Sequence, residues 1–556
     1  ASAIRAMGLK DAAKALMEQA GVPVVPGYHG ADQTPDLLAA EAEKIGFPVL
    51  IKARAGGGGK GMRLVEDPAD FADALAAAQR EGQASFGDPA CLIEKYITSP
   101  RHIEIQVFAD SHGNVVHLFE RDCSLQRRHQ KVIEEAPAPG MPDDVRAAMG
   151  AAAVEAARAI GYVGAGTVEF IADGSGPLRP DGFWFMEMNT RLQVEHPVTE
   201  AITGLDLVAL QLDVAADKPL PFGQDDLSID GHAFEARLYA EDAEAGFLPA
   251  TGRLSHLAFP EGVAFERGAV RIDSGVGDGD EITPFYDPMI AKLIVHGPDR
   301  ATALRQLSRA LGKTRVAGTV TNLGFLKRLA DHEGFGAGQV DTGLIARDLD
   351  NLTKPDEGKR VWAERAAALG ALGLPRTRAT DPWSALNGFR AWGTAEQTVD
   401  LMRGDARLSV RVAIKSPTTF DIDGVQVEAT AFGEDLKLSD SRSDVSLGLF
   451  ADAQSVTVFD DATVTRFDRI DPLDRTDVAA AGGDVVRAPM PGLVTQVRVA
   501  PGDEVETDMP LLTLEAMKME HTLRAPRNGV VAEVLADAGG QVENGAMLVR
   551  LEALDD

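Results

Sequence analysis

Two carboxylates near the middle of the chain are spaced so that they could hold one cation together. Glu169 and Glu187 lie in two strand-like runs, 166–172 and 182–189, which a turn-rich loop joins. Alternate residues of a strand share a face, so Asn189 faces the same way as Glu187. If the two runs pair antiparallel, these hard oxygen ligands come together as a site for Mg²⁺. The alternative is that both carboxylates are solvated on edge strands.

A run of alternating polar and apolar residues follows directly: Asn189-Thr190-Arg191-Leu192-Gln193-Val194-Glu195-His196-Pro197. If this run is extended, Arg191, Gln193 and Glu195 point to one side. A guanidinium that binds an anion, an amide and a carboxylate base would then converge. The same pattern also fits a ladder of surface ion pairs, which contributes little to stability.

A glycine-rich loop with a lysine before it indicates a place for phosphate groups. The loop, Gly56-Gly57-Gly58-Gly59-Lys60-Gly61, is followed by a strand-like run rather than by the helix of a dinucleotide loop. We expect it to be a hairpin tip whose backbone N–H groups can cover phosphates. Lys52 lies on the preceding strand, 49–53. A lysine on a buried strand requires an anionic partner.

The C-terminal part of the chain is an internal repeat. Residues 487–515 align on residues 524–552 without a gap, and each half alternates apolar and polar residues around Pro-Gly or Gly-Gly turns. Two such halves predict a flattened β-barrel with a pseudo-twofold axis. Their junction, Ala516-Met517-Lys518-Met519, is then a tight and exposed hairpin with Lys518 at its tip. Two methionines flank this lysine where polar residues are usual.

The elements that position these groups divide the chain into four predicted regions. Residues 1–348 mix helical and strand patterns, and residues 349–470 contain a helix at 355–372 and then short β-type runs typical of a small antiparallel barrel or sandwich. Residues 471–484 have the composition of a linker, and the repeat occupies residues 485–553. The predicted fold class is therefore multidomain, α/β followed by all-β.

Composition excludes several classes of protein. The chain has 556 residues, with 55 Lys and Arg against 85 Asp and Glu, which makes the formal net charge −30. We expect no nucleic-acid and no membrane partner, because this charge repels both and no apolar run reaches the roughly 18 residues that a span needs. Two cysteines exclude a disulfide scaffold.

The hairpin around Lys518 resembles that of biotin carboxyl carrier domains, whose Ala-Met-Lys-Met motif is intact here. The competing assignment is a lipoyl domain, which has the same fold but typically an Asp-Lys-Ala tip. The resemblance implies that a biotin protein ligase attaches biotin to Lys518 through an amide bond, which removes the charge of the lysine.

The first region resembles ATP-grasp enzymes, and specifically the biotin carboxylase component of acyl-CoA carboxylases. The motifs are 121–139, 187–199, Phe247-Leu248-Pro249 and Tyr286-Asp287-Pro288-Met289. The resemblance implies that residues 25–95 form a lid and that a Rossmann-like subdomain belongs before residue 1, so that the ATP-grasp unit is N-truncated. It implies ATP, Mg²⁺ (or Mn²⁺) and bicarbonate as ligands, with carboxyphosphate as the activated species.

The same resemblance assigns residues to the site. Those for ATP are Lys10, Lys52, Gly57, Gly58, Glu94, Lys95, Ile97, His102, Gln126 and His129. Those for the metal are Glu169, Glu187 and Asn189, and those for bicarbonate are Arg191, Gln193 and Val194. The catalytic set is Glu195 as the base, Arg191, Lys131, and Arg271 as the residue that stabilises the biotin enolate.

The region 349–470 resembles the domain that docks such chains to a carboxyltransferase β subunit, on Asp381-Pro382-Trp383-Ser384 and Asn387-Gly388-Phe389-Arg390. We also expect self-association through this domain or the carboxylase. Met519-Glu520-His521-Thr522 is most similar to the subfamily that acts on 3-methylcrotonyl-CoA in leucine breakdown, with the propionyl-CoA subfamily as the alternative. A hypothesis of another class is a non-catalytic nucleotide-binding scaffold with a lipoyl-type carrier. The expected compartment is bacterial cytoplasm, or the mitochondrial matrix in a eukaryote.

Overall fold

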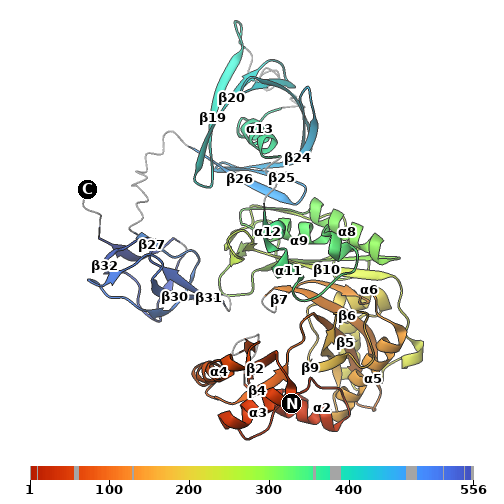
Figure 1. Cartoon of the computed structure of the whole chain (residues 1–556). Helices are drawn as coiled ribbons and strands as arrows, with labels where there is room; N and C mark the ends of the chain where they lie inside the picture. Colours follow the sequence, from red (N-terminus) through yellow and green to blue (C-terminus); the bar gives the residue numbers. More distant parts are fainter. Residues whose placement is uncertain are drawn as a thin grey trace.

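The computed structural model describes residues 2–8, 10–55, 62–127, 130–354, 359–375, 390–470, 485–516, 519–543 and 545–552 (Figure 1). We name three parts by position: the N-terminal region (to residue 354), the barrel region (359–470) and the C-terminal region (485–552). The predicted fold class is confirmed, because α/β elements fill the first part and strands dominate the other two.

A small sheet with two helices forms a unit of its own within residues 25–95. The strand order is β1-β4-β2-β3, and α3 and α4 pack on it. Leu38, Ile51, Phe71 and Ile93 belong to a separate buried cluster there, which suits the lid predicted for this segment. The predicted hairpin is confirmed, since β2 and β3 pair antiparallel. The elements are β1 (Gly27–Tyr28), α3 (Pro35–Ile45), β2 (Val49–Ala53), β3 (Met62–Val65), α4 (Phe71–Phe86) and β4 (Cys91–Lys95), preceded by α1 (Ser2–Met7) and α2 (Lys10–Gln19).

An eight-stranded antiparallel sheet, in the order β15-β17-β10-β7-β6-β5-β8-β9, is the centre of the N-terminal region. Helix α5 packs on β5 and β6, and α8 packs on β10 and β17. Its strands are β5 (Pro100–Ala109), β6 (Val115–Arg127), β7 (Gln130–Ala136), β8 (Gly164–Asp173), β9 (Phe183–Asn189), β10 (His232–Tyr239), β15 (Val270–Ser274) and β17 (Met289–Gly297). The helices are α5 (Asp143–Ala159), α6 (His196–Thr203), α7 (Leu207–Ala215), α8 (Arg300–Lys313), α9 (Leu323–Ala330), α10 (Glu333–Gly336), α11 (Leu344–Arg347) and α12 (Leu349–Thr353). Short strands are β11 (Glu241–Asp242), β12 (Leu248–Pro249), β13 (Gly252–Arg253), β14 (His256–Ala258), β16 (Glu281–Ile282) and β18 (Arg315–Ala317).

The alternation of side chains across this sheet separates an apolar face from a charged one. On β5, Ile103 and Ile105 join the buried cluster beneath α5, so Glu104 between them must point to the opposite face. On β10, Phe234 and Ala236 join the cluster beneath α8, and Arg237 points away from it. Burial of the apolar face therefore brings the charged residues of several strands together on the other face.

Strands β19 to β26 close into a barrel with helix α13 inside it (Figure 1). The helix and the antiparallel barrel expected from the sequence are confirmed, and the sandwich alternative is wrong. Small residues let α13 lie against the strands: a Cβ on Gly370 would lie 2.8 Å from Leu449 Cδ2. The elements are α13 (Arg360–Ala371), β19 (Ala395–Arg403), β20 (Ala406–Ile414), β21 (Thr419–Ile422), β22 (Val425–Phe432), β23 (Asp435–Ser439), β24 (Asp444–Ala451), β25 (Ser455–Asp460) and β26 (Thr463–Arg469).

The barrel region contacts the N-terminal region through β26, which touches α9 and β18. Arg315 forms ion pairs with Glu434 at 3.3 Å and with Asp435. The rings of His256 and Phe450 stack with their centroids 5.0 Å apart. His256 also meets the ring of Phe459, at a centroid distance of 6.0 Å. Charge pairs and aromatic contacts thus hold the two regions together.

The C-terminal region consists of two four-stranded sheets, β27-β34-β32-β29 and β31-β30-β28-β33. If each strand of the first sheet is replaced by the strand four places further along, counting on from β34 to β27, the order of the second sheet results. This is the pseudo-twofold arrangement that the repeat predicts. Strands β30 and β31 form the hairpin at the junction, with Ala516 opposite Met519. The strands are β27 (Val485–Arg487), β28 (Gly492–Val497), β29 (Glu504–Val505), β30 (Pro510–Ala516), β31 (Met519–Arg524), β32 (Gly529–Val534), β33 (Gln541–Val542) and β34 (Met547–Leu551).

Candidate active site

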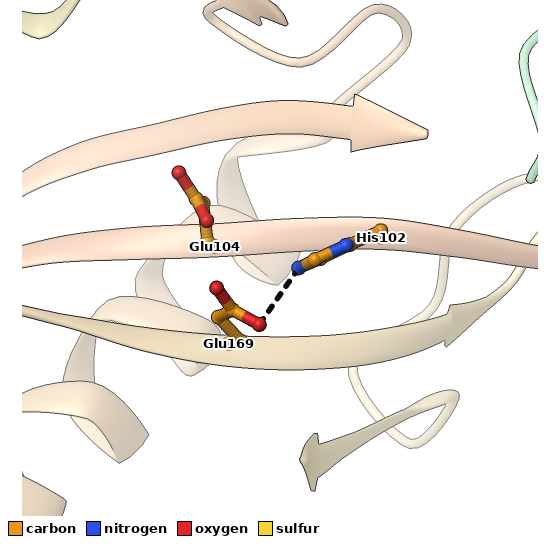
Figure 2. A group of neighbouring side chains, drawn as sticks. All are labelled: His102, Glu104 and Glu169. Carbon is orange, nitrogen blue, oxygen red and sulfur yellow. Dashed lines mark ion pairs between the residues drawn. The ribbon is translucent and has the colours of Figure 1, made fainter. Parts of the chain in front are cut away.

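A part-buried lysine and three buried carboxylates form the centre of the charged face. Lys131, on β7, places Nζ 2.5 Å from Glu104 Oε2 and 3.2 Å from Glu169 Oε1, and it also contacts Glu195. Figure 2 shows the neighbouring pair: His102 Nε2 lies 3.2 Å from Glu169 Oε2. Strands β5 and β8 set Glu104 directly opposite Glu169, so both side chains share one face.

Charge compensation keeps these carboxylates ionised although they are buried. Burial alone would raise the pKa of Glu104, but Lys131 and Arg121 outweigh it and lower that pKa to about 2. For Glu169, burial is likewise outweighed by Lys131 and His102, and its pKa lies well below the usual range. At neutral pH the site therefore presents carboxylates, which are ligands for cations and acceptors for protons.

Glu195 is held between two cations at the start of α6. Its side chain is buried, and Oε2 lies 3.0 Å from Arg237 Nη2 while Oε1 meets Lys131. Burial and the charge of Glu104 raise the pKa of Glu195, but Lys131 and Arg237 outweigh them, and the net shift is downward. An ionised carboxylate in this position can accept a proton from a bound substrate.

The segment before Glu195 is not extended, which corrects the expectation for residues 190–195. A turn at Val194 and Glu195 leads into α6 at His196, because Pro197 in its first turn favours a helix start. Gln193 still reaches the site and donates to Glu169 Oε1 at 3.0 Å. Arg191 is exposed, and its Nη2 lies 3.4 Å from Asn189 Oδ1. Gln193 and Glu195 therefore converge on the site, whereas Arg191 does not.

The predicted metal ligands lie where their pattern placed them. Glu169 pairs directly with Glu187 across β8 and β9, and Thr167 pairs with Asn189, so the antiparallel pairing is confirmed. Asn189 Nδ2 donates to Glu169 Oε1 at 2.9 Å, and Glu187 is exposed. Two carboxylates and an amide oxygen on one face form a donor set that fits Mg²⁺.

Several of the residues predicted to contact ATP have definite partners in the structure. Lys52 Nζ lies 2.6 Å from Glu94 Oε2, which supplies the anionic partner that a lysine on this strand requires. Lys95 Nζ donates to the carbonyls of Gly46 and Phe47, and Gln126 pairs with Lys131 between β6 and β7. Ile97 is half-buried between β4 and β5. The following lie outside the described residues: Gly57, Gly58, His129, Lys518 and the side chain of Lys10.

Arg271 makes its side-chain hydrogen bonds to Glu200 and Asp273. Its Nη1 donates to Glu200 Oε2 at 2.6 Å and its Nη2 to Asp273 Oδ2 at 2.8 Å. The guanidinium that contacts Glu195 belongs to Arg237, which the sequence analysis missed. The alternation of Glu235 and Arg237 with apolar residues was the available signal, because it marks a strand with one charged face.

Arg121 is a second residue that the sequence analysis did not single out. Its side chain is fully buried, and Nε donates to Glu104 Oε1 at 2.6 Å. Its Nη1 donates to Gln106 Oε1 and Thr199 Oγ1, both at 2.8 Å. Arg121 therefore ties β5 and β6 to α6 beneath the site and fixes Glu104 for Lys131.

The comparisons with known proteins agree with this geometry. Residues 10–222 match the family described as carbamoyl-phosphate synthase L chain, ATP binding domain, and residues 235–347 match the biotin carboxylase C-terminal domain. Residues 484–551 match the family described as biotin-requiring enzyme. The chain is 46% identical to methylcrotonoyl-CoA carboxylase subunit alpha, mitochondrial, of Dictyostelium discoideum, over 94% of this chain and 76% of that protein. The chain belongs to the methylcrotonoyl-CoA carboxylase α-subunit family.

Two further comparisons concern a related family and a solved structure. The propionyl-CoA carboxylase alpha chain of Ruegeria pomeroyi is 39% identical over 94% of this chain and 80% of that protein, so it is a less similar relative than the methylcrotonoyl-CoA carboxylase α subunit. The biotin carboxylase domain dimer of Hydrogenobacter thermophilus 2-oxoglutarate carboxylase, solved with MgADP, ADP and bicarbonate, has a TM-score of 0.59. It is 40% identical and covers 64% of this chain and 76% of that chain. None of the described helices is long and apolar enough to cross a bilayer.

A buried acid next to the site gives a prediction for stability against pH. Glu235 pairs with Lys292 at 3.6 Å, and among the described residues neither of its oxygens has a hydrogen-bond partner. Burial raises its pKa to about 8. Between pH 4.5 and 8 the folded state binds this proton and the unfolded state does not, so stability falls as the pH rises, by at most about 1.4 kcal/mol per pH unit.

Glu235→Gln should remove this dependence. We expect the difference in Tm, that of the variant minus that of the unsubstituted chain, to increase from pH 5 to pH 8 and to stay constant above pH 8. Thermal unfolding in a series of buffers measures it. Parallel Tm curves for the two proteins would contradict the assignment.

Proposed function

We propose that this chain uses ATP and bicarbonate to carboxylate biotin on Lys518, for transfer to 3-methylcrotonyl-CoA by a carboxyltransferase β subunit. The observation that carries the proposal is the buried Glu195 carboxylate, held between Lys131 and Arg237 beside the Glu169–Glu187 pair. Family membership supports the acyl-CoA, and the propionyl-CoA alternative rests on a less similar relative.

Each residue of the site has a distinct role in this proposal. Glu195 takes the proton of bicarbonate, so that a bicarbonate oxygen can attack the terminal phosphate of ATP. Gln193 and Arg191 orient the anion, while Lys131 and Lys52 offset charge on the phosphates. Glu169, Glu187 and Asn189 would hold Mg²⁺, which would supply further charge neutralisation. Biotin supplies the nitrogen that accepts the carboxyl group. The 25–95 unit shields the reaction from water.

The domain boundaries follow from the same proposal. Residues 1–348 form the carboxylase, 349–470 the docking domain, 471–484 the linker, which lies outside the described residues, and 485–553 the carrier. A β subunit and a biotin protein ligase are the proposed partners. Self-association is supported by the relative that is described as a dimer. Of the two expected compartments, the mitochondrial matrix has the support of the Dictyostelium relative, which is named as mitochondrial.

Co-purification with the β subunit, followed by a panel of acyl-CoA substrates, tests the function. We expect bicarbonate-dependent ATP hydrolysis and carboxylation fastest with 3-methylcrotonyl-CoA. A faster reaction with propionyl-CoA would transfer the assignment to that alternative. Nucleotide binding without turnover in the complex would favour the scaffold hypothesis instead.

Substitution of the two arginines distinguishes their roles. Arg237 touches Glu195 directly, so Arg237→Lys, which keeps the charge but loses the planar fork, should lower kcat at least about tenfold, equivalent to about 1.4 kcal/mol. Arg271→Lys, whose hydrogen bonds go to Glu200 and Asp273, should have a smaller effect. Steady-state ATP hydrolysis with bicarbonate and free biotin measures both. The opposite ranking would restore Arg271 to the role expected from the sequence.

A further inference from the structure

One turn of the C-terminal region is buried outside the core of that region. Met490, in Pro489-Met490-Pro491, is only 1% exposed. It is nevertheless not among the described residues that pack together as the apolar core of the C-terminal region. All three residues of the turn line a cavity of about 550 Å³ whose other walls belong to the N-terminal and barrel regions. A large apolar side chain is therefore buried between regions rather than within one.

The walls of this cavity come from loops of the N-terminal region, from α9 and from strands β25 and β26 of the barrel region. The N-terminal region contributes residues 242–251 in part and residues 317–321, and the barrel region contributes residues 462–464. Ala317 is buried, whereas Val320 at the same wall is 52% exposed. The space that remains and the exposed valine show that the contact is incompletely packed. Such contacts are typical of transient association, which suits a domain that must leave again.

The cavity wall is joined to the catalytic strands. Arg127, at the end of β6, lies over the ring of Phe247 at 4.0 Å from the centroid. Gln130, at the start of β7, donates to Glu241 Oε1 at 3.3 Å. Lys131 follows directly on β7. Phe247 and Glu241 each adjoin a residue that lines the cavity, so a domain bound there is linked through this segment to the β6–β7 pair that carries the central lysine.

The turn lies at the end of the C-terminal region that bears the β30–β31 hairpin. Leu493, just after the turn on β28, pairs with Glu515, just before the end of β30. Figure 1 shows β30 and β31 on the side of the C-terminal region that faces the N-terminal region. Seating the turn in the cavity thus directs the hairpin strands that flank Lys518 towards the carboxylase.

We propose that the Pro489-Met490-Pro491 turn is a docking element, which binds the carrier reversibly at the junction of the carboxylase and the barrel during carboxylation. The proposal rests on the proposed function of the carrier. Its partner is a surface of the same chain, and Met490 is the anchor. Docking raises the local concentration of the hairpin at the carboxylase and leaves the chemistry with a free acceptor unchanged.

Two variants on opposite walls test the proposal in the full chain. Met490→Ser removes the anchor, and Val320→Lys places a charged chain at the exposed wall. Matched controls are Met509→Ser, at an exposed methionine of the same region, and Val208→Lys, at an exposed valine of α7. Single-turnover transfer of label from bicarbonate to biotinylated protein should slow at least tenfold in both test variants and stay unchanged in both controls. Free-biotin-stimulated ATP hydrolysis should be unchanged in all four.

Amide hydrogen exchange provides a readout that does not depend on activity. Residues 317–321 should exchange faster in Met490→Ser than in the natural chain, and equally in Met509→Ser. Unchanged transfer to the tethered acceptor in both test variants would overturn the proposal, as would unchanged exchange at 317–321. If the natural chain lacks free-biotin activity, the proposed function fails, while the exchange result still decides the docking.

Discussion

Replacing Lys518 by arginine should abolish acyl-CoA carboxylation by the complex while leaving ATP hydrolysis with free biotin intact. Arginine keeps a positive charge at the hairpin but lacks the primary amine that forms the amide bond. Lys518 is the only lysine after residue 437, so a modification in the C-terminal part of the chain has a single possible amine. Intact mass after treatment with ligase and biotin measures attachment, and the acyl-CoA assay measures transfer.

Lys437→Arg is the matched control, because Lys437 is an exposed lysine of the barrel paired with Asp444 at 3.1 Å. It should accept one biotinyl group per chain and retain full activity. A mass increase of one lipoyl group in the natural chain would support the lipoyl alternative. Full carboxylation by the Lys518→Arg complex would refute the carrier role.

Glu195→Gln should lower kcat for bicarbonate-dependent ATP hydrolysis by about 10²- to 10⁴-fold, the range that general base catalysis contributes. The amide fills the same space but cannot accept the bicarbonate proton. Because Glu195 is ionised well below neutral pH, the loss should be present across the whole range above pH 6. Steady-state rates from pH 6 to 9, with saturating ATP and bicarbonate, measure it.

Glu120→Gln is a suitable control for the loss of a buried charge. Glu120 lies on β6 of the same sheet but pairs with Arg146 of α5, at 3.0 Å, on the opposite face. Its replacement should lower stability and leave kcat within a few fold. If kcat of Glu195→Gln equals that of the unsubstituted chain, or if kcat falls equally in both variants, Glu195 is not the base.

The parts of the site that the sequence predicted depend on local regularity. Alternation along β8 and β9 was enough to bring Glu169 opposite Glu187, because a short loop joins the two strands and the side-chain period of a strand is two. The repeat likewise predicted the paired sheets of the C-terminal region, since two equal halves can bury their apolar faces only against each other.

The parts that failed depend on contacts between distant segments. Extended geometry for residues 190–195 was overridden by the start of α6, where Glu195 itself occupies the N-cap position. Arg237 was missed because β10 reaches the site by pairing with β7, about a hundred residues earlier in the chain. Strand periodicity identifies a charged face, but it does not say which other charged face it will meet.

The ion pairs of the charged face have a consequence for substrate exchange. With Lys131 bound to Glu104, Glu169 and Glu195, and Lys52 bound to Glu94, the resting protein carries its own counter-ions. An incoming anion must compete with these carboxylates for the two ammonium groups, and this competition weakens its binding. When the products leave, the same carboxylates return, which keeps the lysines from retaining spent phosphate and lets the cycle begin again.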